Sequence, residues 1–381
     1  MQVDTTKNVE QLCAGLNDAQ REAVVHADGP LLILAGPGSG KTRVVTRRAA
    51  CLAQTVTTPR HILAITFTNK AAREMQDRMR ALDVTGGITV CTFHALCARL
   101  LREYHQRAGI PGNFTIFDRD DRRKLIKAAI EQCDLSTTNW APARVDHVIS
   151  RAKNAMLTAE RFGEAMADWS TRTIARIYER YEALLAKMGG LDFDDLLMRV
   201  ALLLSEDAEL CAELEDRFRY VLIDEYQDTN MAQYQMARLI TAKRRNLCVT
   251  GDPDQSIYGW RGANIENILS FERDYADARV VRLEQNYRST KRVLAAADAL
   301  IAGNVRRKEK GLWTENEDGP AIRGLEAETG DEEAQMIAHD ICRCINNGHA
   351  AGDVAVFYRV NSLSRVLEEA LLRQGIAYQI A

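Results

Sequence analysis

Eight consecutive residues have the types and spacing that could bind the phosphates of a nucleotide. They are Ala35, Gly36, Pro37, Gly38, Ser39, Gly40, Lys41 and Thr42. Glycines let backbone N–H groups close around phosphate oxygens, and the helix expected to start here adds favourable partial charge. In such a loop Lys41 would reach the β- and γ-phosphates, and the hydroxyl of Thr42 would bind Mg²⁺. Ala35 is a mild departure, because glycine usually stands at that position.

A pair of carboxylates stands where another apolar run ends. Residues 219–224 close with Asp224, and Glu225 follows directly. A phosphate-binding loop needs such a carboxylate for its metal at the end of a neighbouring strand. Asp224 would then hold Mg²⁺ through its water shell, and Glu225 would polarise the attacking water as general base. By itself, the acidic pair would also fit a strand that ends in solvated acids.

Short apolar runs alternate with helical segments through much of the first 284 residues. Helical composition follows the first runs, as at 41–53 and 68–82. The runs lie at 30–35, 61–67, 88–93, 219–224, 246–250 and 278–284. Short apolar strands separated by helices are typical of a parallel sheet covered on both faces. The predicted fold class is therefore α/β.

The alternation stops between about 114 and 200. Apolar residues recur at helical spacing from Ile174 to Met188, and 118–134 and 144–156 also have helical composition. This pattern predicts an all-helical insertion that ends at Gly189 and Gly190. Farther on, 304–320 is expected to form a loop. After it we expect strands at 321–328, 353–360 and 376–380, with helices at 331–347 and 362–374.

Composition excludes several classes of protein. Of 381 residues, 46% are apolar and 27% charged, which is typical of a globular chain and not of a disordered or collagen-like one. No apolar run approaches the ~18 residues of a membrane-spanning helix, and the start lacks the features of a secretory signal. We therefore expect a cytosolic protein with no membrane partner. Guanine as the bound base is not supported, because the nearest match to its Asn-Lys-x-Asp reader, residues 69–72, lacks the aspartate.

The cysteines and the net charge indicate which compartment, metal and nucleic-acid contacts to expect. The nine cysteines form no CxxC pair and are typical of free thiols in a reducing compartment. Cys91, His94 and Cys97 could offer three metal ligands, but no fourth is apparent, so no structural metal is expected. The net charge of −3 means that a nucleic acid would have to bind in a local groove. The basic runs 122–124 and 243–245 are predicted to be solvated faces.

Further segments follow the phosphate-binding loop motif in a fixed order. The whole set is LNDAQREAV (16–24), AGPGSGKTR (35–43), ITFTNKAAREM (65–75), VCTFHALCARLLR (90–102), LDFDDLL (191–197), VLIDEYQDTN (221–230), GDPDQSIYGWRGA (251–263), LEQNYRS (283–289) and FYRVNSLSRVLEEAL (357–371). This set resembles the UvrD/Rep/PcrA-type superfamily 1 DNA helicases. In order, the first four resemble the Q motif and motifs I, Ia and Ib. LDFDDLL resembles the return from the helical insertion, the next three resemble motifs II, III and IV, and the last is also family-like.

The resemblance implies ATP and Mg²⁺ as ligands and assigns roles around the nucleotide. For the base, Gln20 would contact adenine, Arg43 would lie near it and Tyr287 would stack on it. Around the γ-phosphate, Gln255 would sense the phosphate or the attacking water, and Arg261 would lie close by. Arg288, on the second lobe, would act as an arginine finger and make hydrolysis depend on closure of two lobes. The catalytic set is therefore Lys41, Glu225, Gln255 and Arg288.

The resemblance also implies a track for single-stranded DNA. Aromatic side chains in motifs that line it are Phe67, His94, Tyr258, Trp260 and Tyr358. Polar side chains that could hold phosphates or sugars are Thr66, Asn69, Arg359 and Asn361. Stacking reads no sequence and is worth roughly 1–3 kcal/mol per base. It also does not sense a 2′-hydroxyl, so RNA stays an alternative, and Phe67 and His94 could instead pack in the core.

The resemblance divides the chain into three parts. Residues 1–90 and 195–284 would form a RecA-like ATP-binding domain, 91–194 its helical insertion, and 285–381 the first part of a second RecA-like lobe. Family members continue further, with the rest of that lobe, an accessory subdomain and motifs V and VI. We therefore expect an amino-terminal portion that binds ATP and single-stranded DNA but unwinds poorly.

The implied activity is ATP-driven translocation on single-stranded DNA with 3′–5′ unwinding. Its expected partners are single-stranded DNA, junctions with duplex, and DNA-repair or replication proteins. Two alternatives stay open: a nucleotide-binding module without motor activity, and a helicase-like subunit of a nuclease complex. A nuclease triad or an iron–sulfur cysteine set would mark the second, and neither is visible in the sequence.

Overall fold

The computed structural model describes residues 5–84, 86–164, 168–305, 307, 308 and 310–380. Its contacts divide the chain into two compact units, Met1–Gly319 and Pro320–Ala381. Within the described ranges, no helix has both the length and the apolar character needed to cross a membrane.

A six-stranded sheet forms the centre of the first unit. Its order is β3-β2-β6-β7-β1-β8, and every pairing is parallel. The strands are β1 (Leu31–Ala35), β2 (Ile62–Thr66), β3 (Thr89–Thr92), β6 (Tyr220–Ile223), β7 (Leu247–Gly251) and β8 (Arg279–Leu283). They confirm the six apolar runs as strands and the α/β class. Because β1, β7 and β6 are neighbours, the residues that follow them meet at one edge of the sheet.

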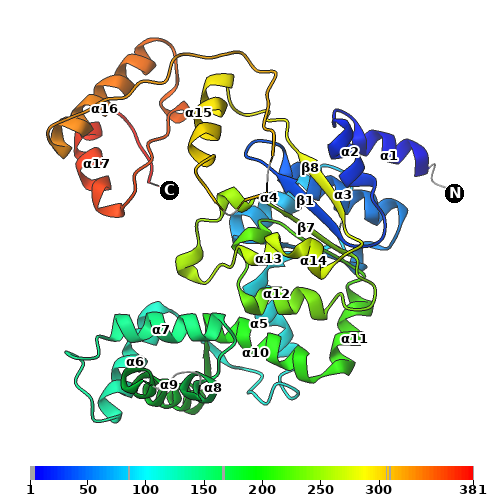
Figure 1. Ribbon diagram of the computed structural model, residues 1–381, viewed down its shortest axis with the longest axis vertical. Coiled ribbons are helices and arrows are strands. Elements are labelled where there is room, and N and C mark those ends of the chain that lie inside the picture. The colour runs from blue at the N-terminus through cyan, green and yellow to red at the C-terminus, as the bar shows by residue number, and fades with distance from the viewer. Residues whose placement is uncertain (1–4, 85, 165–167, 306, 309, 381) are drawn as a thin grey trace. The chain divides into compact units, whose positions relative to one another are not determined.

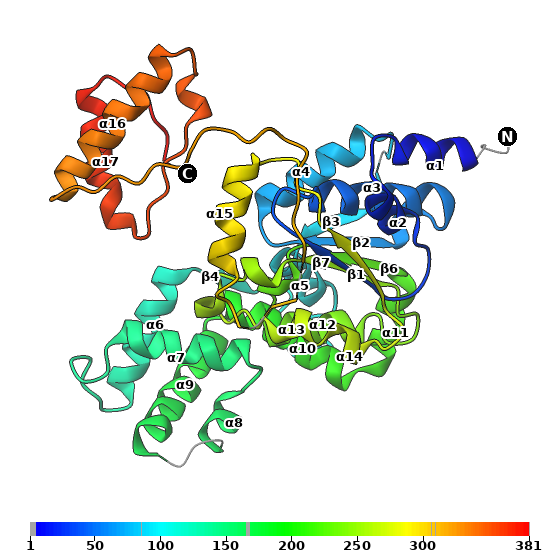
Figure 2. The same cartoon turned by 45° about the horizontal axis from the view of Figure 1, so that its top comes forward.

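Helices cover both faces of this sheet, as Figures 1 and 2 show. Leu31 and Ile33 of β1 pack on one face, with helices that precede or follow the first strands. Leu32 and Leu34 pack on the other face, since side chains alternate along a strand. The first group is α1 (Thr5–Cys13), α2 (Asp18–Val25), α3 (Lys41–Thr55) and α4 (Asn69–Arg80); the second is α5 (Phe93–Glu103), α10 (Phe193–Glu206), α11 (Ala208–Arg217), α12 (Met231–Leu239), α13 (Glu266–Leu269) and α14 (Phe271–Asp274).

Four helices between β4 (Thr115–Phe117) and β5 (Gly190–Asp192) share a separate apolar core. They are α6 (Arg119–Gln132), α7 (Pro142–Asn154), α8 (Ala159–Glu164) and α9 (Trp169–Lys187), and they lie together in Figure 1. β4 and β5 pair in parallel, so the chain enters and leaves this group at one place. The separate core begins at Phe117, whereas α5 packs with the sheet. The predicted domain boundaries stay a prediction.

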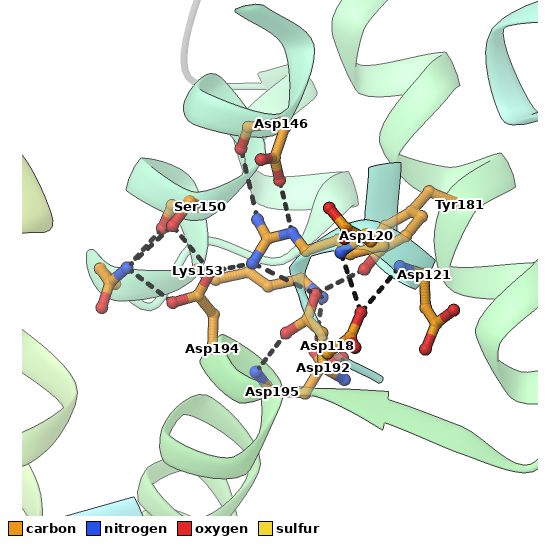
Figure 3. Close-up of polar contacts among 12 residues, drawn as sticks. Asp118, Asp120, Asp121, Asp146, Ser150, Lys153, Tyr181, Asp192, Asp194 and Asp195 are labelled. Carbon is orange, nitrogen blue, oxygen red and sulfur yellow. Dashed lines mark hydrogen bonds and ion pairs between the residues drawn. The ribbon is translucent and has the colours of Figure 1, made fainter. Parts of the chain in front are cut away.

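Ion pairs join the four-helix group to α10 in its interior. The Nζ atom of Lys153 lies 2.9 Å from Asp192 Oδ2, 2.7 Å from Asp195 Oδ1 and 2.6 Å from Glu182 Oε1, and its side chain is fully buried. The first two carboxylates point toward this lysine in Figure 3. Tyr181 donates its hydroxyl to Asp192 over 2.7 Å. The sharing of one ammonium among three carboxylates ties α7 to α9 and to the start of α10.

The prediction of a solvated face at 122–124 is wrong for Arg122. Its side chain is 10% exposed, and it pairs with Asp146 over 2.5 Å and with Asp194. The reason is the carboxylate cluster of 192–195, which lies far away in the sequence and reaches Arg122 only in the folded chain. In the second basic run, Lys243 and Arg244 are exposed and Arg245 is half-buried.

After β8 the chain forms α15 (Lys291–Ile301) and then a mostly irregular segment, which agrees with the predicted loop at 304–320. In the second unit, α16 (Gly330–Asn346) and α17 (Ser364–Arg373) pack through a small apolar core. The strands predicted at 321–328, 353–360 and 376–380 are wrong: none is a strand. A strand needs a neighbouring strand to pair its backbone groups, and these segments pair with none in the described part of the second unit.

Candidate nucleotide site and aromatic surface

The phosphate-binding loop connects β1 to α3 at the centre of the sheet. Gly38 and Gly40 have positive φ angles of 67° and 86°, which glycine adopts without strain. The N-cap of α3 is Gly40, which has no side chain to bond the first N–H groups, and such groups can bind an anion. A cavity of about 510 Å³ opens above the loop. It is lined by Gly36, Pro37, Gly38, Ser39, Gly40, Lys41, Thr42, Arg43, Arg78, Glu225, Gln255, Tyr287 and Arg288.

Lys41 and Thr42 face the two acids that follow β6. Lys41 Nζ lies 3.3 Å from Glu225 Oε2, and the hydroxyl of Thr42 donates to Asp224 Oδ2 over 3.3 Å. Burial, together with the charge of the neighbouring Glu225, raises the pKa of Asp224 to about 6, against the lowering by Lys41. We predicted from the sequence that Lys41, Thr42, Asp224 and Glu225 lie close together. The parallel order of β1, β7 and β6 brings them to one edge of the sheet.

Asp228 adds a third carboxyl group, which is affected by the charges of Glu225 and Lys41. Burial and the charge of Glu225 raise the pKa of Asp228 to about 7. Lys41 is the cation that lowers the pKa of both Asp224 and Asp228. Carboxylates beside a hydroxyl oxygen are the donor set that a hard divalent cation prefers. The residues present therefore fit Mg²⁺, with Thr42 and Asp224 as the side chains that would hold it.

Glu225 is held in an unusual backbone conformation. Its φ of 54° and ψ of 43° are left-handed, which costs a non-glycine residue of order 1–3 kcal/mol. Its backbone N–H donates to Asp224 Oδ1 over 3.0 Å, and Gln227 Nε2 donates to its Oε2 over 2.9 Å. These contacts aim the carboxylate into the cavity, where a general base would have to lie.

Gln255 enters the cavity from the segment after β7. Its side-chain oxygen accepts from Lys41 Nζ over 3.1 Å, and its Nε2 donates to Asp252 Oδ2 over 2.7 Å. It belongs to a short 3-10 helix, Pro253–Gln255, whose start is capped by Asp252. The amide thus presents its carbonyl end to the place where Lys41 would meet a phosphate.

Gln20 lies behind the phosphate-binding loop and does not line the cavity. It is 1% exposed; its Nε2 donates to the Ser39 carbonyl over 2.9 Å, and its oxygen accepts from Asn17 N over 3.2 Å. Both ends of this amide therefore support the backbone. Ala35 is the last residue of β1 and is fully buried, so its side chain packs in the core below the loop. Contact of Gln20 with adenine stays a prediction.

Tyr287 and Arg288 reach the cavity because the segment after β8 is bonded to the loop. Tyr287 N donates to the Gly38 carbonyl over 2.9 Å, and Asn286 Nδ2 donates to the Pro37 carbonyl over 2.7 Å. The Asn286 side chain also accepts from Arg288 N over 2.9 Å. The sequence reasoning missed Asn286, although it stands beside the tyrosine of the same motif.

Arg78 is a second cavity residue that the sequence reasoning missed. It lies on α4, downstream of the motif at 65–75, and its side chain is 50% exposed. Arg78 reaches the cavity because α4 packs beside α3, and no local sequence pattern predicts this.

Aromatic side chains form a separate surface next to the ends of β2 and β7. The rings of Phe67 and Tyr258 stack with centroids 5.8 Å apart and an interplanar angle of 18°. Trp260 is 64% exposed, and the Arg261 guanidinium lies 4.6 Å from its ring centroid and 5.3 Å from that of Tyr258. Arg261 was predicted near the γ-phosphate. It does not line the cavity above the phosphate-binding loop, and its contact with a γ-phosphate stays a prediction.

The other residues predicted to bind DNA differ in exposure. His94 is half-buried against Phe193, with centroids 5.8 Å apart, and burial lowers its pKa. Thr66 is 2% exposed and donates its hydroxyl to the Thr68 carbonyl, whereas Asn69 is exposed at the start of α4. The three residues predicted from the second unit, all exposed there, are Tyr358, Arg359 and Asn361. Their DNA contacts stay a prediction.

Cysteines and metal-ligand clusters add no further site. All nine cysteines are free thiols. Burial raises the pKa of Cys91 to about 11, so this thiol is inert at neutral pH. Among the residues that the structure describes, no group of three or more His, Cys, Asp or Glu side chains is arranged to hold a metal ion.

Comparison with known proteins agrees with this geometry. The family described as "UvrD/REP helicase N-terminal domain" matches residues 16–276, and "UvrD-like helicase C-terminal domain" matches 281–381. The chain is 45% identical to "ATP-dependent DNA helicase PcrA" of Bacillus subtilis over 374 residues, which is 97% of this chain and 51% of the relative. The same protein of Leuconostoc citreum is 46% identical over 378 residues (98% and 50%), and that of Staphylococcus aureus is 44% identical over 366 (95% and 50%). The chain thus spans about half the length of the curated relatives it matches.

Proposed function

The chain belongs to the UvrD/Rep helicase family, and we propose that it hydrolyses Mg·ATP in response to single-stranded DNA, as the motor portion of a DNA helicase. One observation carries this proposal. Lys41, Glu225 and Gln255 converge on one cavity, and the segment that supplies Gln255 continues within three residues to Tyr258 of the aromatic surface. A change at the phosphate is thereby connected to a surface suited to stacking bases.

The cavity residues predicted from the sequence would each have a role in phosphoryl transfer. The backbone of 36–40 and Lys41 would hold the phosphates, and Arg43 and Tyr287 would enclose the adenine. Thr42 and Asp224 would hold Mg²⁺, which would supply positive charge next to the phosphate oxygens. Glu225 would accept the proton of the attacking water, and Gln255 would orient that water. Arg288 would stabilise the negative charge that develops on the transferred group.

The aromatic surface would bind single-stranded DNA without reading its sequence. Phe67, Tyr258 and Trp260 offer ring faces, and His94 would border them. The basic group among them, Arg261, would add contacts to bases through its planar guanidinium. We propose a RecA-like architecture with a helical insertion and a second lobe, 3′–5′ movement toward duplex junctions, and a cytosolic setting with repair or replication proteins as partners.

The test is ATP hydrolysis by the purified 381-residue chain with Mg²⁺, with and without poly(dT). We expect poly(dT) to raise kcat, and blunt duplex DNA of equal nucleotide content to raise it far less. Trp260→Ala should reduce this stimulation while leaving ATP affinity unchanged. Equal rates with poly(dT), duplex and no DNA would contradict the proposal.

A further inference from the structure

A chain of polar contacts leads from the nucleotide cavity into the segment after α15. Lys41 Nζ donates to Gln255 Oε1 over 3.1 Å, and Gln255 Nε2 donates to Asp252 Oδ2 over 2.7 Å. The other carboxylate oxygen, Asp252 Oδ1, pairs with the ammonium of Lys310. That ammonium also lies 3.1 Å from Asp254 Oδ2. Lys310 is therefore separated from the phosphate-binding lysine by two side chains, those of Gln255 and Asp252.

Lys310 and Asp252 are so deeply buried that each charged group needs the other as its partner. The Lys310 side chain is 1% exposed and that of Asp252 is 0% exposed. A lone charge in this position would be strongly unfavourable, so the lysine holds the Asp252 side chain in place. Gln227 Oε1 accepts the Asp252 backbone N–H over 3.0 Å, which holds the residue from its other side.

The contacts of Asp252 decide which way the Gln255 amide points. A carboxylate whose Oδ1 pairs with the Lys310 ammonium accepts hydrogen bonds through Oδ2, so Gln255 presents its NH₂ group to Asp252. Its carbonyl oxygen must then point to Lys41 and the cavity. If the amide were reversed, a carbonyl would face a carboxylate and an NH₂ would face an ammonium, and both contacts would be repulsive.

The residues that follow Lys310 connect it to the other side of the cavity. Gly311 N donates to Glu284 Oε1 over 3.0 Å, and Trp313 pairs with Gln285 in a short β-bridge. Leu312 lies against the phosphate-binding loop: a Cβ added to Gly36 would come within 2.3 Å of its Cδ2. The segment 310–313 therefore runs alongside the residues that carry Tyr287 and Arg288.

We propose that Lys310 is a positioning residue for ATP hydrolysis: through Asp252 it fixes the polarity of the Gln255 amide, and it makes this polarity depend on the docking of segment 310–313. The inference rests on the proposed function and deepens it, because it names a residue through which segment 310–313, alongside the residues that carry Arg288, controls the γ-phosphate contact. A lysine with a purely structural role would affect stability alone.

The experiment compares Lys310→Met with Lys308→Met in the full 381-residue chain. Lys308 is a matched control on the same segment: it pairs with Glu272, whose side chain is 48% exposed. Two quantities are measured, namely kcat and KM for ATP with poly(dT), and the ratio of affinities for ATPγS and ADP in Mg²⁺. We expect Lys310→Met to lower kcat by about 10- to 100-fold, the usual effect of losing a supporting contact behind a reacting group. The preference for ATPγS over ADP should fall toward equality, while KM and ADP affinity stay near wild type.

A double variant, Lys310→Met with Asp252→Asn, separates positioning from burial of charge and decides the question if Lys310→Met alone does not fold. It removes both charges, so thermal unfolding should occur near the wild-type temperature. Hydrolysis should stay low, because an asparagine amide can turn either its oxygen or its NH₂ toward Gln255.

Recovery of hydrolysis in the double variant would overturn the inference, as would a folded Lys310→Met protein with unchanged kcat and ATPγS preference. If the wild-type chain shows no hydrolysis at all, the proposed function fails. The affinity ratio then still tests the role of Lys310, because it needs binding and no turnover.

Discussion

Replacing Lys153 with methionine should strongly destabilise the group formed by α6–α9. Methionine fills similar volume but leaves Asp192, Asp195 and Glu182 around the space that the ammonium occupies, with contacts of 2.6–2.9 Å lost. Removing one partner of a buried ion pair costs about 3–5 kcal/mol, because the other charge stays buried without compensation. Since domains are stable by only about 5–15 kcal/mol, this is a large share of the total.

The loss should depend on pH in a defined direction. Burial and the charge of Asp192 raise the pKa of Asp195 to about 7 even though Lys153 lowers it, so without Lys153 it rises further. A carboxyl whose folded pKa is raised favours folding when protonated, and this contribution is lost as pH rises through the folded pKa. The free-energy deficit of Lys153→Met should therefore be larger at pH 8 than at pH 6.

Urea unfolding followed by tryptophan fluorescence measures this deficit, because Trp140 and Trp169 lie in the same helical group, with ring centroids 5.8 Å apart. Lys124→Met is the matched control. Its side chain is 78% exposed and its pair with Asp121 spans 3.6 Å, so it should change the free energy of unfolding by less than about 0.5 kcal/mol. If both variants unfold alike, or if the Lys153→Met deficit is the same at both pH values, the buried cluster does not hold the group together as argued.

Three further predictions concern the two proposed sites. Glu225→Gln should lower kcat with poly(dT) by about 10²–10⁴ and leave ATP affinity near wild type, since it removes the base and keeps the shape; steady-state kinetics check this, and a normal kcat would assign the proton to another group. Gly38→Ala should weaken binding of a fluorescent ATP analogue far more than the control Gly29→Ala. Both glycines have a positive φ. A Cβ at Gly38 would lie 2.7 Å from Arg288 Cβ, whereas a Cβ at Gly29 would meet no described atom within 4 Å. Equal affinities in these two variants would mean that the loop and Arg288 do not meet as described. Trp260→Ala should weaken binding of labelled single-stranded DNA by about 5- to 150-fold, which corresponds to about 1–3 kcal/mol of stacking. Trp169→Ala on α9 is the control and should not change this affinity. Anisotropy titration measures both affinities, and equal losses would show that the aromatic surface is not the binding site.

Local sequence was sufficient to predict that Lys41, Thr42 and Glu225 lie around one cavity. The strand, glycine-rich loop and helix at 31–55 are consecutive, and their conformation depends on φ angles and hydrogen bonds within a few residues. Asp224 and Glu225 follow a buried strand, and a parallel sheet brings such strand ends to one edge. The sequence therefore determined the α/β class, the loop and the acids that face it.

Tertiary structure decided what depends on residues far apart in the chain. Arg122 is buried because carboxylates some 70 positions later neutralise it, and Lys310 is buried because Asp252 and Asp254 do the same. Arg261 lies against the rings of Tyr258 and Trp260, a contact that the folded chain shows. The apolar segments of the second unit, though strand-like in composition, form no sheet without partner strands. A local pattern indicates which secondary structure a segment prefers. A buried charge or a strand is stabilised by a partner far away in the sequence, and only the folded chain shows which partner that is.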